Sequence, residues 1–73
     1  MAQQERNYTL VGVDGNAFCV MAYTSEAMRH CGVEPKTRNA YIAKATSGDY
    51  NNLLATSVDV LNKLNNYQPI NFN

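Results

Sequence analysis

The residues best suited to chemistry form a basic stretch in the middle of the chain, with Glu34 as the one acidic residue among them. The basic residues are Arg29, Lys36, Arg38 and Lys44. These side chains attract anions, and Tyr41 in the same stretch offers a ring on which a base could stack. The stretch therefore predicts a site for a nucleotide, a nucleic acid or an acidic protein surface. The alternative is an ordinary solvated helix face.

Two predicted helix starts are further candidates for anion binding, because free amide groups and the helix dipole both favour negative charge there. One helix begins at Asn16, and another follows Ser47 and Gly48. At each start a carboxylate, Asp14 or Asp49, can accept the same amide protons itself. Each start is therefore either an anion site or a helix that caps itself.

Catalytic and metal chemistry find little support in the sequence. His30 and Cys31 are neighbours, and neighbouring side chains on a helix point about 100° apart, so they do not form a nucleophile–base pair. Cys19 and Cys31 would lie about 18 Å apart on one helix, too far for a disulfide, and we expect both thiols to pack as small apolar groups. A single histidine and no CxxC motif predict no zinc site. We expect a protein that is not an enzyme and has no metal or cofactor.

The elements that would position these residues are predicted in the order β-α-α-α, an α+β fold forming one domain over residues 1–73. Residues 8–13 are β-branched and aromatic and predict a strand, with apolar residues on both faces. A first helix is predicted over about 16–31, capped by Asn16 and ended by Gly32 in the left-handed conformation.

Two further helices follow in the prediction. Pro35 suits the first position of the second helix, which should end around residues 46–48. The third helix should run from about residue 49 to 65. Its predicted apolar stripe is Tyr50, Leu53, Leu54, Ser57, Val58, Leu61 and Leu64.

A single strand leaves its backbone amides without partners. In the extended tail, residues 67–73, Ile70 and Phe72 alternate with asparagines, so the tail could pair as a short edge strand. The other solution is pairing with a second copy. Because so short a chain has a marginal core, we expect a homo-oligomer. Residues 1–7 are polar, and we expect them to be flexible.

Charge and hydropathy narrow the class of protein. The formal net charge is zero, which argues against strong sequence-independent binding of nucleic acid. Residues 1–7 lead into no apolar signal segment, and no apolar run is long enough to cross a membrane. We therefore expect no membrane association and a cytoplasmic location.

Two motifs carry a resemblance to known proteins: Asp14-Gly15-Asn16-Ala17-Phe18, and the segment from Ala45 to Leu54, which reads ATSGDYNNLL. The chain resembles a group of short proteins of tailed bacteriophages and prophages that combine D-G-N-A-F with A-T-S-G-D-Y-x-x-L-L. The resemblance covers roughly residues 8–64. The resemblance implies that the protein originates from a phage or prophage and is located in the host bacterial cell. It provides no catalytic residue that could be assigned to this sequence.

From these observations we expect a phage or prophage accessory protein that binds and does not catalyse. It would counteract a host defence, by inhibiting a defence protein or by sequestering an anionic messenger such as a cyclic nucleotide. The alternatives are a small DNA- or RNA-binding regulator and a structural or assembly protein. The expected ligand-binding residues are Arg29, Lys36, Arg38, Tyr41, Lys44, Asn16, Ser47 and Gly48.

Overall fold

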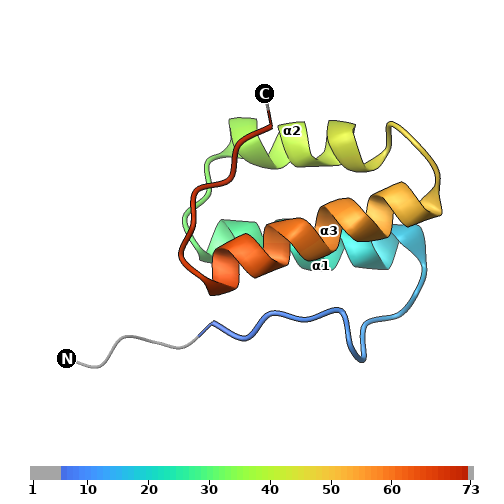
Figure 1. Ribbon diagram of the computed structural model, residues 1–73, viewed down its shortest axis with the longest axis horizontal. Coiled ribbons are helices and arrows are strands. Elements are labelled where there is room, and N and C mark those ends of the chain that lie inside the picture. The colour runs from blue at the N-terminus through green and yellow to red at the C-terminus, as the bar shows by residue number, and fades with distance from the viewer. Residues whose placement is uncertain (1–5, 73) are drawn as a thin grey trace.

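Three helices form the fold of residues 6–72, the part of the chain that the computed structural model describes. They are α1 (Ala17–His30), α2 (Pro35–Ala45) and α3 (Tyr50–Asn65). α1 and α3 run in the same direction and α2 runs opposite to them, so the bundle is up-down-up (Figure 1). Each helix contacts the other two. The three predicted helices are confirmed, with ends within a few residues of those expected.

The ends of α1 follow from local side-chain and backbone chemistry. The Asn16 side-chain oxygen accepts the Phe18 amide proton at 2.8 Å, which makes Asn16 the N-cap. At the other end Gly32 takes a φ of 80°. Its amide donates to the carbonyl of Arg29, and the amide of Val33 donates to that of Met28 at 2.9 Å. These two bonds form a Schellman cap, with Gly32 in the predicted left-handed conformation.

The first turns of α2 and α3 are stabilised in different ways. Pro35 occupies the first turn of α2, where its missing amide proton costs nothing, and no side chain caps that helix. Asp49 caps α3, because its carboxylate accepts the Asn52 amide proton at 2.9 Å.

The core is built around α3, which is buried along an arc wider than the predicted stripe. Its buried residues are Leu53, Thr56, Ser57, Val60, Leu61 and Leu64. Tyr50 and Val58, both predicted inside, are 44% and 45% exposed, whereas Val60 is completely buried. The prediction missed Val60 because α3 packs against two helices at once, which turns more of its surface inward. Tyr50 and Val58 are exposed because Tyr50 is the first residue of α3 and Val58 lies outside the arc of its buried residues.

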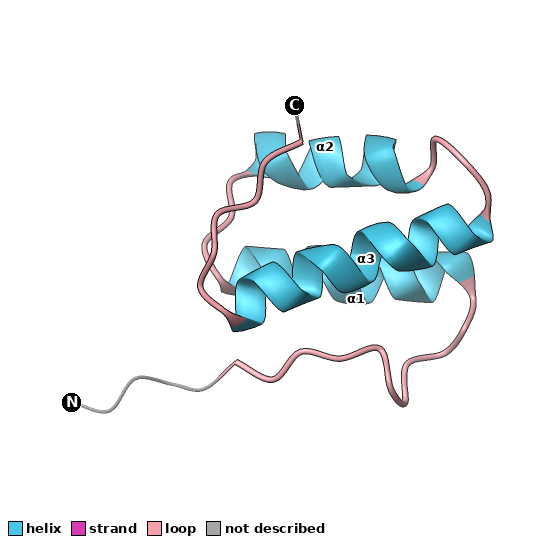
Figure 2. Cartoon of the chain, viewed as in Figure 1, coloured by secondary structure: helices cyan, strands magenta, loops and turns pink. Residues whose placement is uncertain are grey.

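The predicted strand over residues 8–13 is wrong, and with it the α+β class and the β-α-α-α order. Residues 6–72 contain three helices and no strand (Figure 2). A turn interrupts the segment: the Val13 amide donates to the Leu10 carbonyl at 3.0 Å, and Gly12 lies at a φ of 86°. Tyr8 and Leu10 pack against the core, but Val11 at the turn is 86% exposed. Only one face of the segment is therefore covered.

Side chains satisfy the backbone groups that a second strand was expected to pair. The Asn65 side-chain amide accepts the Tyr8 N–H proton at 2.8 Å and donates to the Tyr8 carbonyl at 2.9 Å. The Thr9 amide donates to the Tyr23 hydroxyl at 3.1 Å. One asparagine thus imitates the two hydrogen bonds of a strand partner, so neither the tail nor a second copy is needed for this purpose.

The C-terminal tail lies on the other side of α3 from the N-terminal segment. Ile70 and Phe72 pack against the core, and the Phe72 and Tyr41 rings are 6.5 Å apart. The tail crosses from the end of α3 towards α2 without forming a strand (Figures 1 and 2). The predicted edge strand is therefore wrong for residues 67–72, although Ile70 and Phe72 do face inward.

Residue 6 is the first described residue of the segment expected to be flexible, and residues 1–5 of that segment lie outside the described part of the chain. Arg6 donates from Nη1 to the Leu64 carbonyl at 3.3 Å, and its guanidinium lies 4.0 Å from the centre of the Tyr67 ring. Arg6 is thus held against the end of α3. Within residues 6–72, none of the helices combines the length and the apolar character that crossing a membrane requires.

Replacing Asn65 with alanine should destabilise the fold by about 1–3 kcal/mol, because two hydrogen bonds to Tyr8 are lost. Urea denaturation followed by circular dichroism measures the change. Asn62→Ala is the matched control, because Asn62 is an exposed asparagine on the same helix and carries the same gain in helix propensity. Equal stability of the two variants would contradict the role given to Asn65.

Candidate functional site

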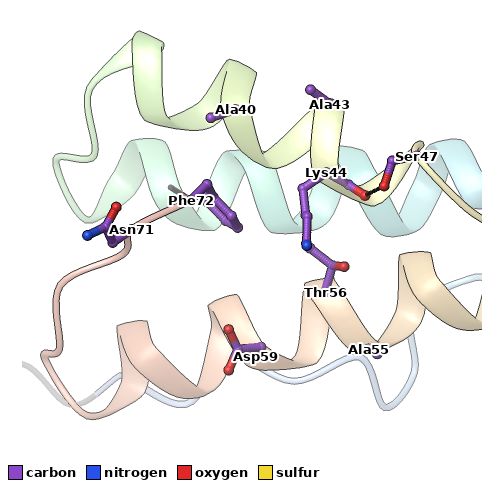
Figure 3. A pocket seen from close by; sticks show the side chains of 9 residues that line it. All are labelled: Ala40, Ala43, Lys44, Ser47, Ala55, Thr56, Asp59, Asn71 and Phe72. Atoms are coloured by element: carbon purple, nitrogen blue, oxygen red, sulfur yellow. Dashed lines mark hydrogen bonds between the residues drawn. The ribbon is translucent and has the colours of Figure 1, made fainter.

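The largest hollow described in the structure is an open groove between α2, α3 and the tail, with a volume of about 620 Å³. Three alanines, Ala40, Ala43 and Ala55, leave the space between the two helices open. The other lining residues are Lys44, Ser47, Thr56, Asp59, Asn71 and Phe72 (Figure 3). The groove therefore combines a cation, hydrogen-bonding groups and an aromatic ring.

Lys44 is the charged side chain that reaches across the groove. It extends from α2 towards Thr56 on α3 (Figure 3). The ion pairs among the described residues are Arg29 with Glu26 and Lys63 with Asp59, so no described carboxylate neutralises Lys44. Beside it, the Ser47 hydroxyl donates to the Lys44 carbonyl at 2.7 Å. This end of the groove presents a positive charge beside two hydroxyl groups.

Phe72 and Asp59 stand at the other end of the groove, together with Asn71 (Figure 3). The Phe72 ring is partly buried, and it separates the groove from a second hollow of about 270 Å³ along α2. Lys36 lines that second hollow. Lys36 and Lys44 therefore lie on the same side of α2, on either side of the tail.

The two arginines of the basic stretch line neither of these hollows. Arg29 is exposed on α1 and pairs with Glu26 at 2.8 Å. The hydrogen bond from Arg29 holds the pKa of Glu26 below its ordinary value, and the positive charges of Arg29, His30 and Arg38 add to this effect. Because the charge of Arg38 affects Glu26, a residue of α1, Arg38 lies on the side of α2 that faces α1. Its Nε is buried there without a hydrogen-bond partner among the described residues. The basic stretch is divided between two sides of α2.

Tyr41 belongs to the core. It is completely buried, and its hydroxyl forms a 2.5 Å hydrogen bond with the Ser57 hydroxyl, which joins α2 to α3. The ring has no exposed face on which a base could stack.

The two predicted helix starts are capped by the chain itself. The Asn16 side chain accepts an amide proton of α1, and the Asp14 carboxylate accepts the Asn16 amide proton at 2.8 Å. After Gly48, the Asp49 carboxylate accepts an amide proton of α3. Asn16 and Gly48 therefore lie beside carboxylates and outside the groove.

Of the eight residues predicted to bind a ligand, the groove brings together Lys44 and Ser47, with Lys36 in the adjoining hollow. Sequence reasoning missed Thr56, Asp59, Asn71 and Phe72. Thr56 and Asp59 carried a signal, because polar residues three apart on a helix share a face. For Asn71 and Phe72 the sequence showed only the alternation of apolar residues with asparagines, which suggested a structural role for the tail.

Neither cysteine lines the groove. Cys31 is partly buried, and its Sγ lies 3.7 Å from the Tyr8 hydroxyl, whereas Cys19 is exposed, contrary to the expectation that it packs inside. Among residues 6–72, no three His, Cys, Asp or Glu side chains cluster closely enough to hold a metal ion.

Comparison with known proteins finds no match to a family model, to a curated protein or to a solved structure. The expected likeness to phage proteins stays a prediction that depends on the two sequence motifs, and the assignment of a site depends on the geometry described above.

Replacing Tyr41 with phenylalanine should lower the free energy of unfolding by about 1–3 kcal/mol, because the buried Ser57 hydroxyl loses its partner. The double variant Tyr41→Phe/Ser57→Ala should recover part of this loss, since it leaves no buried hydroxyl unpaired. Denaturant titration of the two variants and the wild type gives the comparison. A single variant as stable as the wild type would show that the hydrogen bond contributes nothing to the fold.

Proposed function

We propose that this protein is a non-enzymatic accessory protein of a phage or prophage that acts by binding, and that its site is the groove between α2 and α3. The ligand is a small anionic molecule with a flat ring, of which a nucleotide is the obvious chemical class. Sequestering such a messenger would counteract a host defence that depends on it.

The observation that carries this proposal is the position of Lys44. Its ammonium group extends into the groove and has no described carboxylate as a partner. A phosphate placed there could also accept a hydrogen bond from the hydroxyl group of Thr56.

The far end of the groove suits a nucleobase. The partly exposed Phe72 ring offers a stacking surface, and Asp59 and Asn71 offer hydrogen-bonding groups of both kinds. The volume of about 620 Å³ falls within the range of roughly 300–1,000 Å³ that is typical of small-molecule sites. The groove thus has room for both ends of a mononucleotide.

The alternative of a DNA- or RNA-binding regulator receives less support. Such a protein needs a continuous basic surface, whereas here Arg38 lies on a different side of α2 from Lys36 and Lys44, and Arg29 lies on α1. Arg29 is also already paired with Glu26. A structural or assembly role would leave the groove without a small-molecule ligand.

Lys44→Gln should weaken nucleotide binding at least tenfold, because a charged hydrogen bond contributes about 1.5–3 kcal/mol. Calorimetric titration with a panel of mononucleotides and cyclic nucleotides measures the affinity. Arg29→Gln is the matched control, with the same change of net charge at a residue outside the groove. Binding that is absent across the panel, or equally weakened in both variants, would refute the groove as a nucleotide site.

The exposed Phe18 ring favours a second form of the proposal, in which the target is a host defence protein. Phe18 is 79% exposed, and Val11 is 86% exposed. Phe18 is an exposed aromatic ring on α1 that a partner protein could cover, as aromatic side chains do at protein interfaces.

If a host protein is the target, Phe18→Ser should abolish its recovery with the tagged protein from a bacterial lysate. Ala22→Ser serves as control, because Ala22 is exposed one helical turn further along the same face of α1. Recovery that both variants retain would exclude this face of α1 as the binding surface.

A further inference from the structure

We propose that the C-terminal tail is an exchangeable strap, and that in a dimer Ile70 and Phe72 of each copy pack against the core of the other copy. The inference is drawn from the tail and its hinge, and it does not depend on the ligand proposed above.

The tail is held against the core of its own chain by side chains alone. In the described part of the chain, residues 69–72 make no hydrogen bond, while Ile70 and Phe72 pack against the core. The Phe72 ring lies beside the buried Tyr41 ring, with 6.5 Å between the two centres. These contacts are the same whichever copy supplies the tail, because they involve nothing that the covalent connection to α3 must provide.

The hinge between α3 and the tail is strained when the tail is closed. Tyr67 has a φ of 56°, a region that residues with a Cβ atom rarely occupy. The turn has the hydrogen bonds of a Schellman cap, from the Tyr67 amide to the Leu64 carbonyl and from the Gln68 amide to the Lys63 carbonyl. The same cap on α1 has Gly32 at this position, with a φ of 80°. In α3 a tyrosine adopts the conformation for which α1 uses glycine.

Opening the hinge removes this strain and releases the tail from its own α2. The contact of the Arg6 guanidinium with the Tyr67 ring, 4.0 Å from its centre, opposes opening. Once a tail has left, the groove beneath it is an uncovered apolar surface. A second opened copy is the partner that fits, because its tail carries the same two apolar residues at the same spacing. Exchange of an identical element in this way is a known route to dimers.

Variants of Tyr67 test the hinge in opposite directions. Tyr67→Pro cannot adopt a positive φ, so the closed tail is forbidden and the variant should be a dimer by sedimentation equilibrium. Tyr67→Gly relieves the strain within the closed form, and its dimer should dissociate about tenfold more readily than that of Tyr67→Ala, which also lacks the ring but keeps a Cβ atom. A folded, monomeric Tyr67→Pro variant would overturn the proposal.

The double variant Tyr67→Pro/Phe72→Ala shows whether the tail forms the dimer interface. It should be monomeric, because the side chain that packs beside Tyr41 of the partner copy is missing. A double variant that dimerises as well as Tyr67→Pro would show that the interface lies elsewhere, and would also overturn the proposal.

Wild-type protein provides the deciding measurement if Tyr67→Pro fails to fold. Isotope-labelled and unlabelled chains are mixed in equal amounts at about 1 mM, which is the effective concentration typical of a group tethered by a short connection. We expect nuclear Overhauser contacts between Phe72 of one chain and Tyr41 of the other. A wild-type protein that is monomeric under these conditions, or a dimer whose Phe72 contacts are all within one chain, contradicts tail exchange.

Discussion

The structure depends on covering both sides of α3, the one helix that is buried along most of its length. Its inward residues face α1 on one side and α2 on the other. Because α1 and α2 are both shorter than α3, they leave part of each side of α3 uncovered, and we call these two uncovered strips the seams. The terminal segments close these seams. Tyr8 and Leu10 contribute from the N-terminal side, and Ile70 and Phe72 from the C-terminal side. A chain of this size buries a smaller fraction of its surface than larger domains do, so these four side chains are a substantial part of its core.

The two terminal segments are held in physically different ways. The N-terminal segment is tied by hydrogen bonds to Asn65 and Tyr23, so releasing it would leave polar groups unpaired unless water replaces their partners. The tail has only apolar contacts over residues 69–72, and its turn places Tyr67 at a positive φ. Segments with few buried contacts and no hydrogen bonds are the first to open locally. The C-terminal side is therefore where a conformational change costs least.

The helices could be predicted from sequence because their signals are local, as at Asn16, Gly32 and Pro35. The strand could not be excluded in that way, because the group that replaces its partner is Asn65, which is distant in sequence. The candidate site was only partly predictable for a related reason. Basic residues show that anions are attracted but not which side of a short polar helix faces its neighbour, so Lys44 and Arg38 were grouped although they lie on different sides.

The groove and the tail are thermodynamically linked, because Phe72 is at once a wall of the proposed ligand site and the anchor of the strap. A ligand can shift a conformational equilibrium only if it binds the two states with different affinity. In a closed monomer and in an exchanged dimer, the groove holds the same side chains in the same contacts, so a ligand would not favour either form. It would disfavour only the open chain, in which Phe72 has left the groove. Because exchange must pass through that open chain, a bound ligand would slow the interconversion of monomer and dimer without changing their ratio.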